Sequence, residues 1–383
     1  MRPGAGDEMQ LERAFLRTGR FFQTEACMGG SVRMYGAEGI YFVTARTLQG
    51  RLLLRPSTQV QQLIGGILAR ASRRYGVRLR GYVFMSNHLH LLVRARGCTL
   101  SAFMQFLLAN IARKVGALHG WHGTFWARRF SCEPVLDAGA ELQRLRYILA
   151  HGVKEGLVAH TAEWPGLTCL AALRGHRERF PFYNWDWRWQ RAHCRGLGRW
   201  SPRLVEEEVL EVEPISAWAS CSEETRCFLV AELVDRLAAE YRLSRGAKRP
   251  LGARAVKRQS PTQPLALERR VDRPRCHASN PLVRYQWARV YADFVAAYRE
   301  ASARFRKGER GVRFPSWCFS PPPGSVAGEA EGSAPRPFAE QLPGKRVAQH
   351  VFDAKRERPR CGGAPGGEGL ATGSGEDLDT PVR

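Results

Sequence analysis

Hydrophobic positions between residues 39 and 151 follow two different periods, and these periods predict alternating strands and helices. Residues 39–45 are rich in β-branched and aromatic side chains, which is typical of a strand. The other predicted strands are 77–84, 88–93 and 129–135. Apolar residues spaced by three and four predict helices over 58–75, 101–118 and 139–151. The order β-α-β-β-α-β, followed by one more helix, predicts an α+β fold with a ferredoxin-like antiparallel sheet.

The chain divides by composition into four parts. Residues 1–30 form a short leader, and the strand and helix pattern places a folded domain at 31–190. Residues 200–315 are mostly helical in pattern. The amphipathic helices expected there are 223–241 and 281–306. Residues 320–383 are rich in Pro, Gly, Ala and Glu and cannot bury enough apolar surface to fold, so we expect a disordered tail.

The charge of the chain is strongly unbalanced. It carries 59 Lys and Arg against 36 Asp and Glu over 383 residues, a formal net charge of +23. Such an excess favours a polyanionic partner, and nucleic acid is the commonest one. The excess is concentrated in 245–275, which holds ten Lys and Arg and two acidic residues. We therefore expect 200–315 to be a basic accessory region that contacts phosphate groups.

Several classes of protein are excluded by what the sequence lacks. No run approaches the roughly 18 apolar residues that a spanning helix needs, and no apolar signal-peptide core opens the chain. The ten cysteines include no C-x-x-C pair, so neither a metal cage nor a disulfide framework is expected. We expect free thiols in a reducing compartment, a cytoplasmic location and no membrane partner.

Two histidines are the first candidates for chemistry. His88 and His90 are two residues apart on a predicted strand, so their side chains point to the same face, about 7 Å apart. Two imidazoles on one face can share a metal ion. The alternative is a pair of polar residues on the solvated face of an edge strand.

A tyrosine and a third histidine lie on the helix predicted over 139–151. Tyr147 and His151 are four residues apart and therefore neighbours on one helix face. They could bring a hydroxyl nucleophile and a third ligand to the site of His88 and His90. The alternative is a packed tyrosine and a helix-terminal histidine that complements the helix dipole.

Four segments in order carry a resemblance to a known family. They are F-M-S-N-H-L-H-L-L at 84–92, G-T-F-W-A-R-R-F at 123–130, R-Y-I-L-A-H-G-V-K-E-G-L at 146–157 and E-W-P at 163–165. Together they resemble the single-tyrosine HUH (His-hydrophobe-His) transposases of the IS200-like superfamily, and within them the REP-associated tyrosine transposases. The resemblance covers less than half of the chain.

The resemblance implies a ferredoxin-like sheet whose two histidines bind Mg²⁺ or Mn²⁺ beside a phosphate of single-stranded or hairpin DNA. It implies that Tyr147 is the nucleophile, that it forms a 5′-phosphotyrosine link, and that His88 and His90 are metal ligands. His151 stands where the family has Asn or Gln, and Gly152 replaces the following Pro. We interpret His151 as a third metal ligand, which would shift the preference toward Mn²⁺, Zn²⁺ or Co²⁺. A homodimer is left open.

Basic and aromatic residues supply candidate DNA contacts. By default the arginines form a solvated basic face, but on such a domain they could also contact the DNA backbone. The candidates are Arg73, Arg74, Arg80, Arg128, Arg129, Lys257 and Arg258. Trp185, Trp187 and Trp189 alternate along the chain and either stack on unpaired bases or, more commonly, close a core between domains.

The sequence thus predicts a metal-dependent, single-strand-specific DNA transposase that cleaves and joins DNA at a hairpin or repeat. Two alternatives remain open at this point. One is a catalytically silent protein that binds and regulates repeat DNA, and the other is a metal-dependent hydrolase in which water is the nucleophile.

Overall fold

The computed structural model describes residues 32–36, 38–96, 99–186, 196, 198–264, 274–316, 318 and 324–327. The predicted leader 1–30 lies outside the described residues, as does the predicted tail 320–383 apart from 324–327. No described helix combines the length and the hydrophobicity that crossing a bilayer would require.

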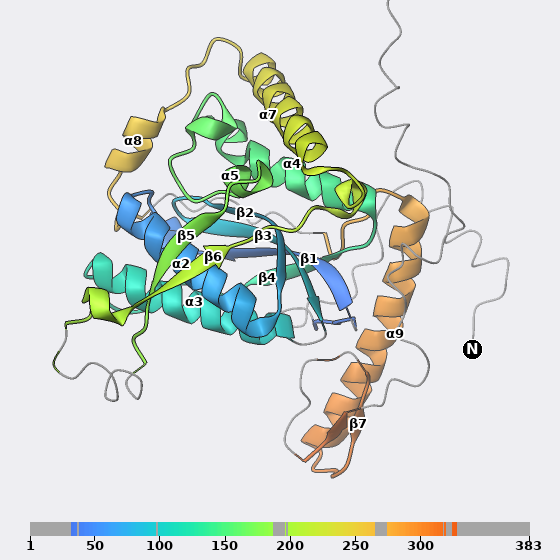
Figure 1. Ribbon diagram of the computed structural model, residues 1–383. Coiled ribbons are helices and arrows are strands. Elements are labelled where there is room, and N and C mark those ends of the chain that lie inside the picture. The colour runs from blue at the N-terminus through green and yellow to red at the C-terminus, as the bar shows by residue number, and fades with distance from the viewer. Residues whose placement is uncertain are drawn as a thin grey trace, which may run out of the picture. The chain divides into compact units, whose positions relative to one another are not determined.

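A four-stranded antiparallel sheet forms the centre of the fold (Figure 1). Its strands are β1 (Glu38–Arg46), β2 (Arg78–Phe84), β3 (His88–Arg96) and β4 (Ser131–Val135). Their spatial order is β2-β3-β1-β4, with α2 (Thr58–Tyr75) between β1 and β2 and α3 (Thr99–Leu118) between β3 and β4. This order and connectivity confirm the ferredoxin-like α+β fold expected from the sequence.

Helices cover both faces of the sheet (Figure 1). Helices α2 and α3 pack together on one face, and α4 (Ala138–Lys154) lies on the other against β2 and β3. Helix α7 (Glu223–Arg245) packs on α4. Because both faces are covered, the central part of β1 and most of β2 and β3 are buried.

Helix α2 shows how the sequence sets the ends of these elements. The Ser57 hydroxyl accepts a hydrogen bond from the Val60 backbone N–H at 3.2 Å, which satisfies a donor that the first turn leaves unpaired. At the other end Gly76 adopts a left-handed conformation with φ 62°, which only glycine adopts without strain. The predicted span of this helix is therefore confirmed.

A second, two-stranded sheet packs on α2 and was not predicted. Strand β5 (Glu178–Tyr183) pairs antiparallel with β6 (Val205–Leu210). Adjacent glycines in α2 allow this close approach, because a Cβ atom on Gly66 would lie 2.1 Å from the carbonyl oxygen of Pro181. We call this β5–β6 pair the ribbon.

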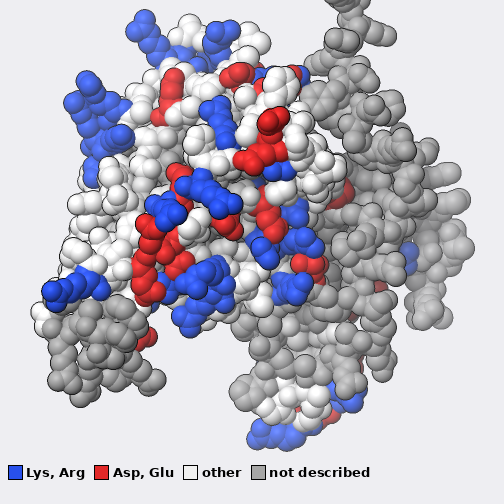
Figure 2. All heavy atoms as spheres, in the orientation of Figure 1, with Lys and Arg blue, Asp and Glu red and all other residues white. Residues whose placement is uncertain are grey.

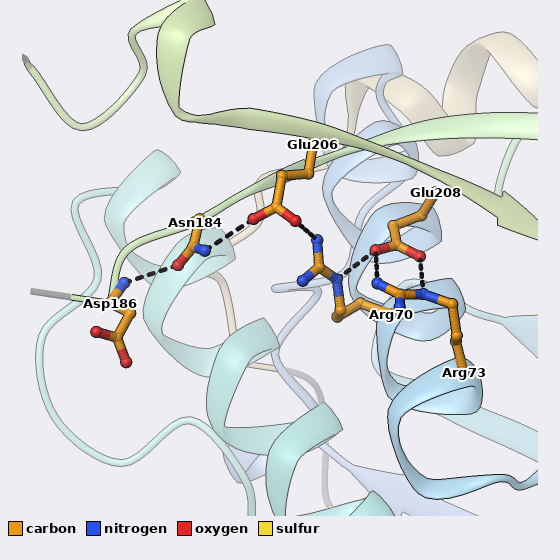
Figure 3. Close-up of polar contacts among 6 residues, drawn as sticks. All are labelled: Arg70, Arg73, Asn184, Asp186, Glu206 and Glu208. Atoms are coloured by element: carbon orange, nitrogen blue, oxygen red, sulfur yellow. Dashed lines mark hydrogen bonds and ion pairs between the residues drawn. The ribbon is translucent and has the colours of Figure 1, made fainter. Parts of the chain in front are cut away.

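Ion pairs hold the ribbon to α2 (Figure 3). Glu208 accepts two hydrogen bonds from Arg73, at 2.8 and 3.0 Å, and also pairs with Arg70. Glu206 pairs with Arg70 and accepts a bond from the Asn184 amide at 2.8 Å. Two glutamates of the ribbon thus neutralise two arginines of α2.

The remaining elements are short or lie late in the chain. They are α5 (Leu170–Leu173), α8 (Ala253–Arg258), α9 (Pro281–Arg306), β7 (Arg313–Phe314), β8 (Val326–Ala327), and the 3-10 helices η1 (Leu48–Gly50), η2 (Thr161–Glu163), η3 (Pro202–Leu204) and η4 (Ser216–Trp218). Helices α7 and α9 cover the two amphipathic segments predicted for this region. Val230, Val234 and Val256 of α7 and α8 belong to the same hydrophobic core as the sheet. The domain boundaries stated above stay a prediction.

Candidate metal and nucleophile site

His88 and His90 open strand β3 and project from the face that α4 covers. In the antiparallel register with β1, His90 lies opposite Thr44 and His88 opposite Arg46. The alternating Leu89 and Leu91 point the other way and are fully buried. The two imidazoles are 5.0 Å apart between ring centroids. The structure thus places both histidines on one face, as predicted.

Hydrogen bonds to Nδ1 orient these two rings. The Thr44 hydroxyl lies 2.9 Å from His90 Nδ1, and the side-chain oxygen of Asn87 lies 2.6 Å from His88 Nδ1. A contact at Nδ1 fixes a ring and leaves its Nε2 for a ligand, which is how metal-binding histidines are usually held. The Nε2 atom of His88 lies 2.8 Å from Nε2 of His151.

Helix α4 brings Tyr147 and His151 to the same place. It begins after Asp137, whose carboxylate accepts a bond from the Ala140 N–H at 2.7 Å, and its buried Leu145 and Ile148 face the sheet. Residues one turn apart share a helix face, so Tyr147 lies above His151, with ring centroids 4.9 Å apart. His151 is 3% exposed.

Gly152 packs against Trp164 of the Trp-Pro element, so the two features belong to one contact. A Cβ atom on Gly152 would lie 3.2 Å from Cε3 of Trp164 and 3.2 Å from Cγ2 of Val158. The Trp164 indole N–H donates to the backbone oxygen of Phe84 at 3.2 Å, at the end of β2. Trp164 therefore packs between α4 and the strand that precedes the histidines, and a small residue at 152 admits it.

Tyr147 lies among aromatic rings and cations. Its ring centroid is 5.2 Å from that of His90 and 5.8 Å from that of Phe42. The Arg144 guanidinium carbon and the Lys154 ammonium nitrogen lie 5.4 and 5.2 Å from the ring centroid. Burial raises the pKa of the Tyr147 phenol, and the nearby cations, Lys154 foremost, act in the opposite direction. The phenol is therefore protonated at neutral pH.

The three histidines fit a divalent metal ion. One nitrogen of each of His88, His90 and His151 lies within 4.8 Å of the others. Burial lowers the pKa of His151 to about 3, which keeps it neutral, the form in which imidazole binds metals. Its buried Nδ1 has no hydrogen-bond partner among the described residues. Three nitrogen donors suit Mn²⁺, Zn²⁺ or Co²⁺ better than Mg²⁺.

Arg80 does not lie where the sequence prediction put it. Its side chain is buried, and its guanidinium donates to a carboxylate oxygen of Glu141 at 2.6 Å and to the Ser216 hydroxyl at 3.0 Å. A buried, ion-paired guanidinium is out of reach of a DNA backbone. Arg80 instead links β2 to α4 and η4, because Glu141 also accepts from the Ser216 N–H at 2.9 Å.

The other predicted DNA contacts are exposed, but they differ in whether an acidic residue already pairs with them. Arg73 and Arg74 are exposed at the end of α2, but Glu208 already occupies Arg73 (Figure 3). Figure 2 shows Lys and Arg interspersed with Asp and Glu on the face in view. Arg128 and Arg129 are exposed before β4, and Lys257 and Arg258 are exposed in the last turn of α8. Residues 265–273 of the basic segment lie outside the described residues.

Of the three alternating tryptophans, only Trp185 lies among the described residues. The Trp185 indole N–H donates to the backbone oxygen of Arg199 at 2.8 Å, and its ring contacts that of Trp200 at 5.0 Å. Trp187 and Trp189 lie outside the described residues.

Sequence reasoning missed the residues that support the site. Asn87 stands inside the F-M-S-N-H segment, so its position beside His88 could have marked it. Thr44 and Phe42 lie on the predicted strand 39–45, but only the register with β3 brings them to the histidines. Arg144 lies one turn before Tyr147, at a spacing that could have indicated it.

Part of this chain is similar to known proteins. Residues 54–151 match the family model "Transposase IS200 like". No curated protein matches the chain. A solved REP-associated tyrosine transposase bound to a REP hairpin is 20% identical, with a TM-score of 0.33, over 37% of this chain and 82% of that one. A Deinococcus radiodurans protein assigned as a transposase is 21% identical, with a TM-score of 0.23, over 31% of this chain and 94% of that one. Residues 54–151, which hold all three histidines and Tyr147, are thus similar to the IS200-like transposase family.

Proposed function

We propose that this protein is a metal-dependent transposase that cleaves and joins single-stranded DNA through a phosphotyrosine intermediate at hairpin or repeat sequences. One observation carries the proposal. The Tyr147 ring lies 4.9 Å from His151 and 5.2 Å from His90, in the histidine cluster that can hold a metal ion. Phosphoryl transfer requires a nucleophile held beside the group that binds and polarises the phosphate, and these residues would supply that arrangement.

The proposed reaction is a transesterification. The Tyr147 phenol oxygen attacks phosphorus, the bond from phosphorus to the 3′ oxygen breaks, and the phenolic proton is released while the departing 3′ oxygen takes up a proton. The products are a 5′-phosphate ester on Tyr147 and a free 3′-hydroxyl. The link retains the energy of the phosphodiester, so a 3′-hydroxyl can attack it to join a strand without ATP.

His88, His90 and His151 would hold the metal, Mg²⁺ or Mn²⁺. A bound divalent cation supplies polarisation of a phosphate oxygen and stabilises the charge on the leaving oxygen. Burial raises the pKa of the Tyr147 phenol, and the nearby cations Lys154, Arg46 and Arg144 offset part of that rise by favouring the phenolate. Thr44 and Asn87 orient the ligand rings.

The proposed substrate is single-stranded or hairpin DNA. The solved transposase that the fold resembles is bound to a REP hairpin. In this chain the exposed Arg128, Arg129, Lys257 and Arg258 would contact the phosphate backbone, in keeping with the net charge of +23. Such contacts position a strand, whereas unpaired bases and hairpin shape would give specificity.

A denaturing gel tests the proposal directly. The full chain is incubated with a labelled hairpin oligonucleotide and Mn²⁺, with EDTA as the metal-free control. We expect a covalent protein–DNA band that requires Mn²⁺ and is absent from Tyr147→Phe. Free cleavage products that persist in Tyr147→Phe would establish the hydrolase instead. Tight binding without any cleavage would establish the silent DNA-binding protein.

A further inference from the structure

A cavity of about 570 Å³ lies along β4, the edge strand of the sheet. Its walls come from residues 32–35, from 128–134 and from 274–275 with the first half of α9. Only the middle wall belongs to the segment that matches the transposase family. Residue 277 joins β4 through a parallel bridge to Val135, so the third wall is fixed to the edge of the sheet. We call this cavity the β4 cleft.

Arginines dominate the charged lining of the β4 cleft. Arg33, Arg128, Arg129 and Arg275 face a single lining carboxylate, that of Glu133. Arg128 and Arg275 are exposed and form no ion pair with any described carboxylate. Burial and the charge of Arg33 lower the pKa of Arg129, as expected where positive charge is crowded. The cleft is therefore suited to an anion.

Aromatic side chains hold two of these guanidinium groups. The guanidinium carbon of Arg33 lies 3.7 Å from the ring centroid of Phe130, and that of Arg275 lies 5.8 Å from the ring centroid of Tyr291. The Arg33 guanidinium also donates to the backbone oxygen of Phe130 and to the Tyr35 hydroxyl, so it holds the wall of the cleft together. A guanidinium against a ring face, such as that of Arg275, can direct its in-plane N–H donors toward a phosphate.

The β4 cleft adjoins the tyrosine site. Glu133 of its lining lies opposite Phe42 in the register of β4 with β1. Phe42 stacks on His90 at 5.2 Å and meets the Tyr147 ring at 5.8 Å. Phe42 of β1 therefore lies between Glu133 of the cleft and the Tyr147 ring.

We propose that the β4 cleft binds a nucleotide of the DNA strand next to the cleaved phosphate, with its phosphodiester on Arg128 and Arg275. The identity of the ligand as DNA rests on the proposed function. A volume of this size admits a nucleotide, and the lining supplies both phosphate donors and aromatic surface. Arg33 and Arg275 lie outside the matched segment, so this chain adds the cleft to the transposase domain.

The salt dependence of DNA binding tests the proposal. Binding of a fluorescent single-stranded 20-mer is followed by anisotropy from 50 to 300 mM salt in EDTA, in the Tyr147→Phe background so that no cleavage occurs. Each phosphate contact adds about 0.7 to the slope of log K against log salt. Arg128→Ala/Arg275→Ala should therefore flatten the slope by about 1.4. Arg275→Gln alone should flatten it by about 0.7.

A matched control removes the same charge elsewhere. Arg177 and Arg242 are exposed and do not line the cleft, so Arg177→Ala/Arg242→Ala should leave the slope unchanged. Arg128→Lys/Arg275→Lys should retain most of the slope. Equal slopes for the cleft and control doubles would overturn the proposal. Displacement of the 20-mer by millimolar inorganic phosphate as effectively as by a deoxynucleoside monophosphate would also overturn it, because the cleft would then hold a free phosphate.

The test of the β4 cleft and the test of the proposed function can fail independently of each other. A covalent adduct at Tyr147 together with equal slopes would retain the transposase and remove the cleft as a DNA site. A flattened slope in the cleft double without any adduct in the wild-type chain would retain the cleft and remove the phosphotyrosine chemistry.

Discussion

At the scale of single residues, the fold contains a buried lysine that the functions proposed above do not use. Lys114 of α3 is 1% exposed, and its ammonium nitrogen lies 3.7 Å from the ring centroid of Phe182 in the ribbon. That nitrogen has no hydrogen-bond partner among the described residues. Burial, aided by Arg113 and Arg70, lowers the pKa of Lys114 to about 7. A lysine in this position costs stability whenever it is charged.

The pH dependence of unfolding should report this lysine. Between pH 7 and about 10 the unfolded chain binds a proton at Lys114 that the folded chain has released, so stability rises with pH across this window. We expect Lys114→Met to remove most of that rise and to increase the free energy of unfolding at pH 6 by roughly 2–4 kcal/mol. Urea unfolding of both proteins at pH 6, 8 and 9.5 measures this. Parallel pH profiles would contradict the assignment.

At the scale of elements, periodicity predicted the parts of the fold that repeat a simple pattern. The four strands and helices α2, α3 and α4 were predicted because their apolar residues recur with a regular spacing. The spacing is two residues in a strand and three or four residues in a helix. The ribbon was not, because β6 contains Glu206, Glu207 and Glu208 in sequence and β5 contains Pro181. Two of those glutamates are satisfied by arginines of α2, which no local pattern reveals.

The site, like the fold, has a part that local sequence spacing predicts and a part that depends on packing. The spacing of His88 and His90 and that of Tyr147 and His151 fix which side chains share a face, so the sequence predicted the pairs. Bringing the pairs together depends on how α4 packs across the sheet. The burial of Arg80 is a further consequence of that packing, since its partner Glu141 lies on α4.

The contact between α2 and the ribbon makes a sharp test at this scale. A methyl group at Gly66 would meet backbone, the Pro181 carbonyl oxygen at 2.1 Å, which cannot rotate away. We expect Gly66→Ala to lower the free energy of unfolding by roughly 2 kcal/mol or more, despite the better helix propensity of alanine. Gln62→Ala, at an exposed position of the same helix, should leave stability within about 0.5 kcal/mol. Similar chemical-denaturation midpoints for the two variants would refute the close contact.

At the scale of the whole molecule, net charge alone is a poor guide to where DNA binds. Part of the positive charge is already matched by carboxylates, as at Arg73 with Glu208 and at Arg80 with Glu141. Arg128 and Arg275 of the β4 cleft, which form no ion pair with a described carboxylate, and the exposed end of α8 are better candidates. The sequence predicted the partner from the total charge, but only the structure separates matched from unmatched cations.

A double and a single substitution distinguish exposed cations from an ion-paired one. Lys257→Gln/Arg258→Gln removes exposed charge and should weaken binding of a single-stranded oligonucleotide, flattening its salt slope by about 1.4. Arg73→Gln removes a cation that Glu208 already neutralises, so it should leave the slope unchanged. Anisotropy titrations at four salt concentrations compare them. A change of slope in Arg73→Gln as large as in the double variant would show that the ion pair opens to bind DNA.

The central claim is that the Tyr147 oxygen becomes joined to DNA. Peptide mapping by mass spectrometry, after incubation with a hairpin oligonucleotide and Mn²⁺ and nuclease trimming, locates the attachment directly. We predict a nucleotide attached through its 5′ phosphate to Tyr147 and to no other tyrosine. Attachment at another residue, or cleaved DNA with an unmodified Tyr147 peptide throughout the time course, would contradict the account.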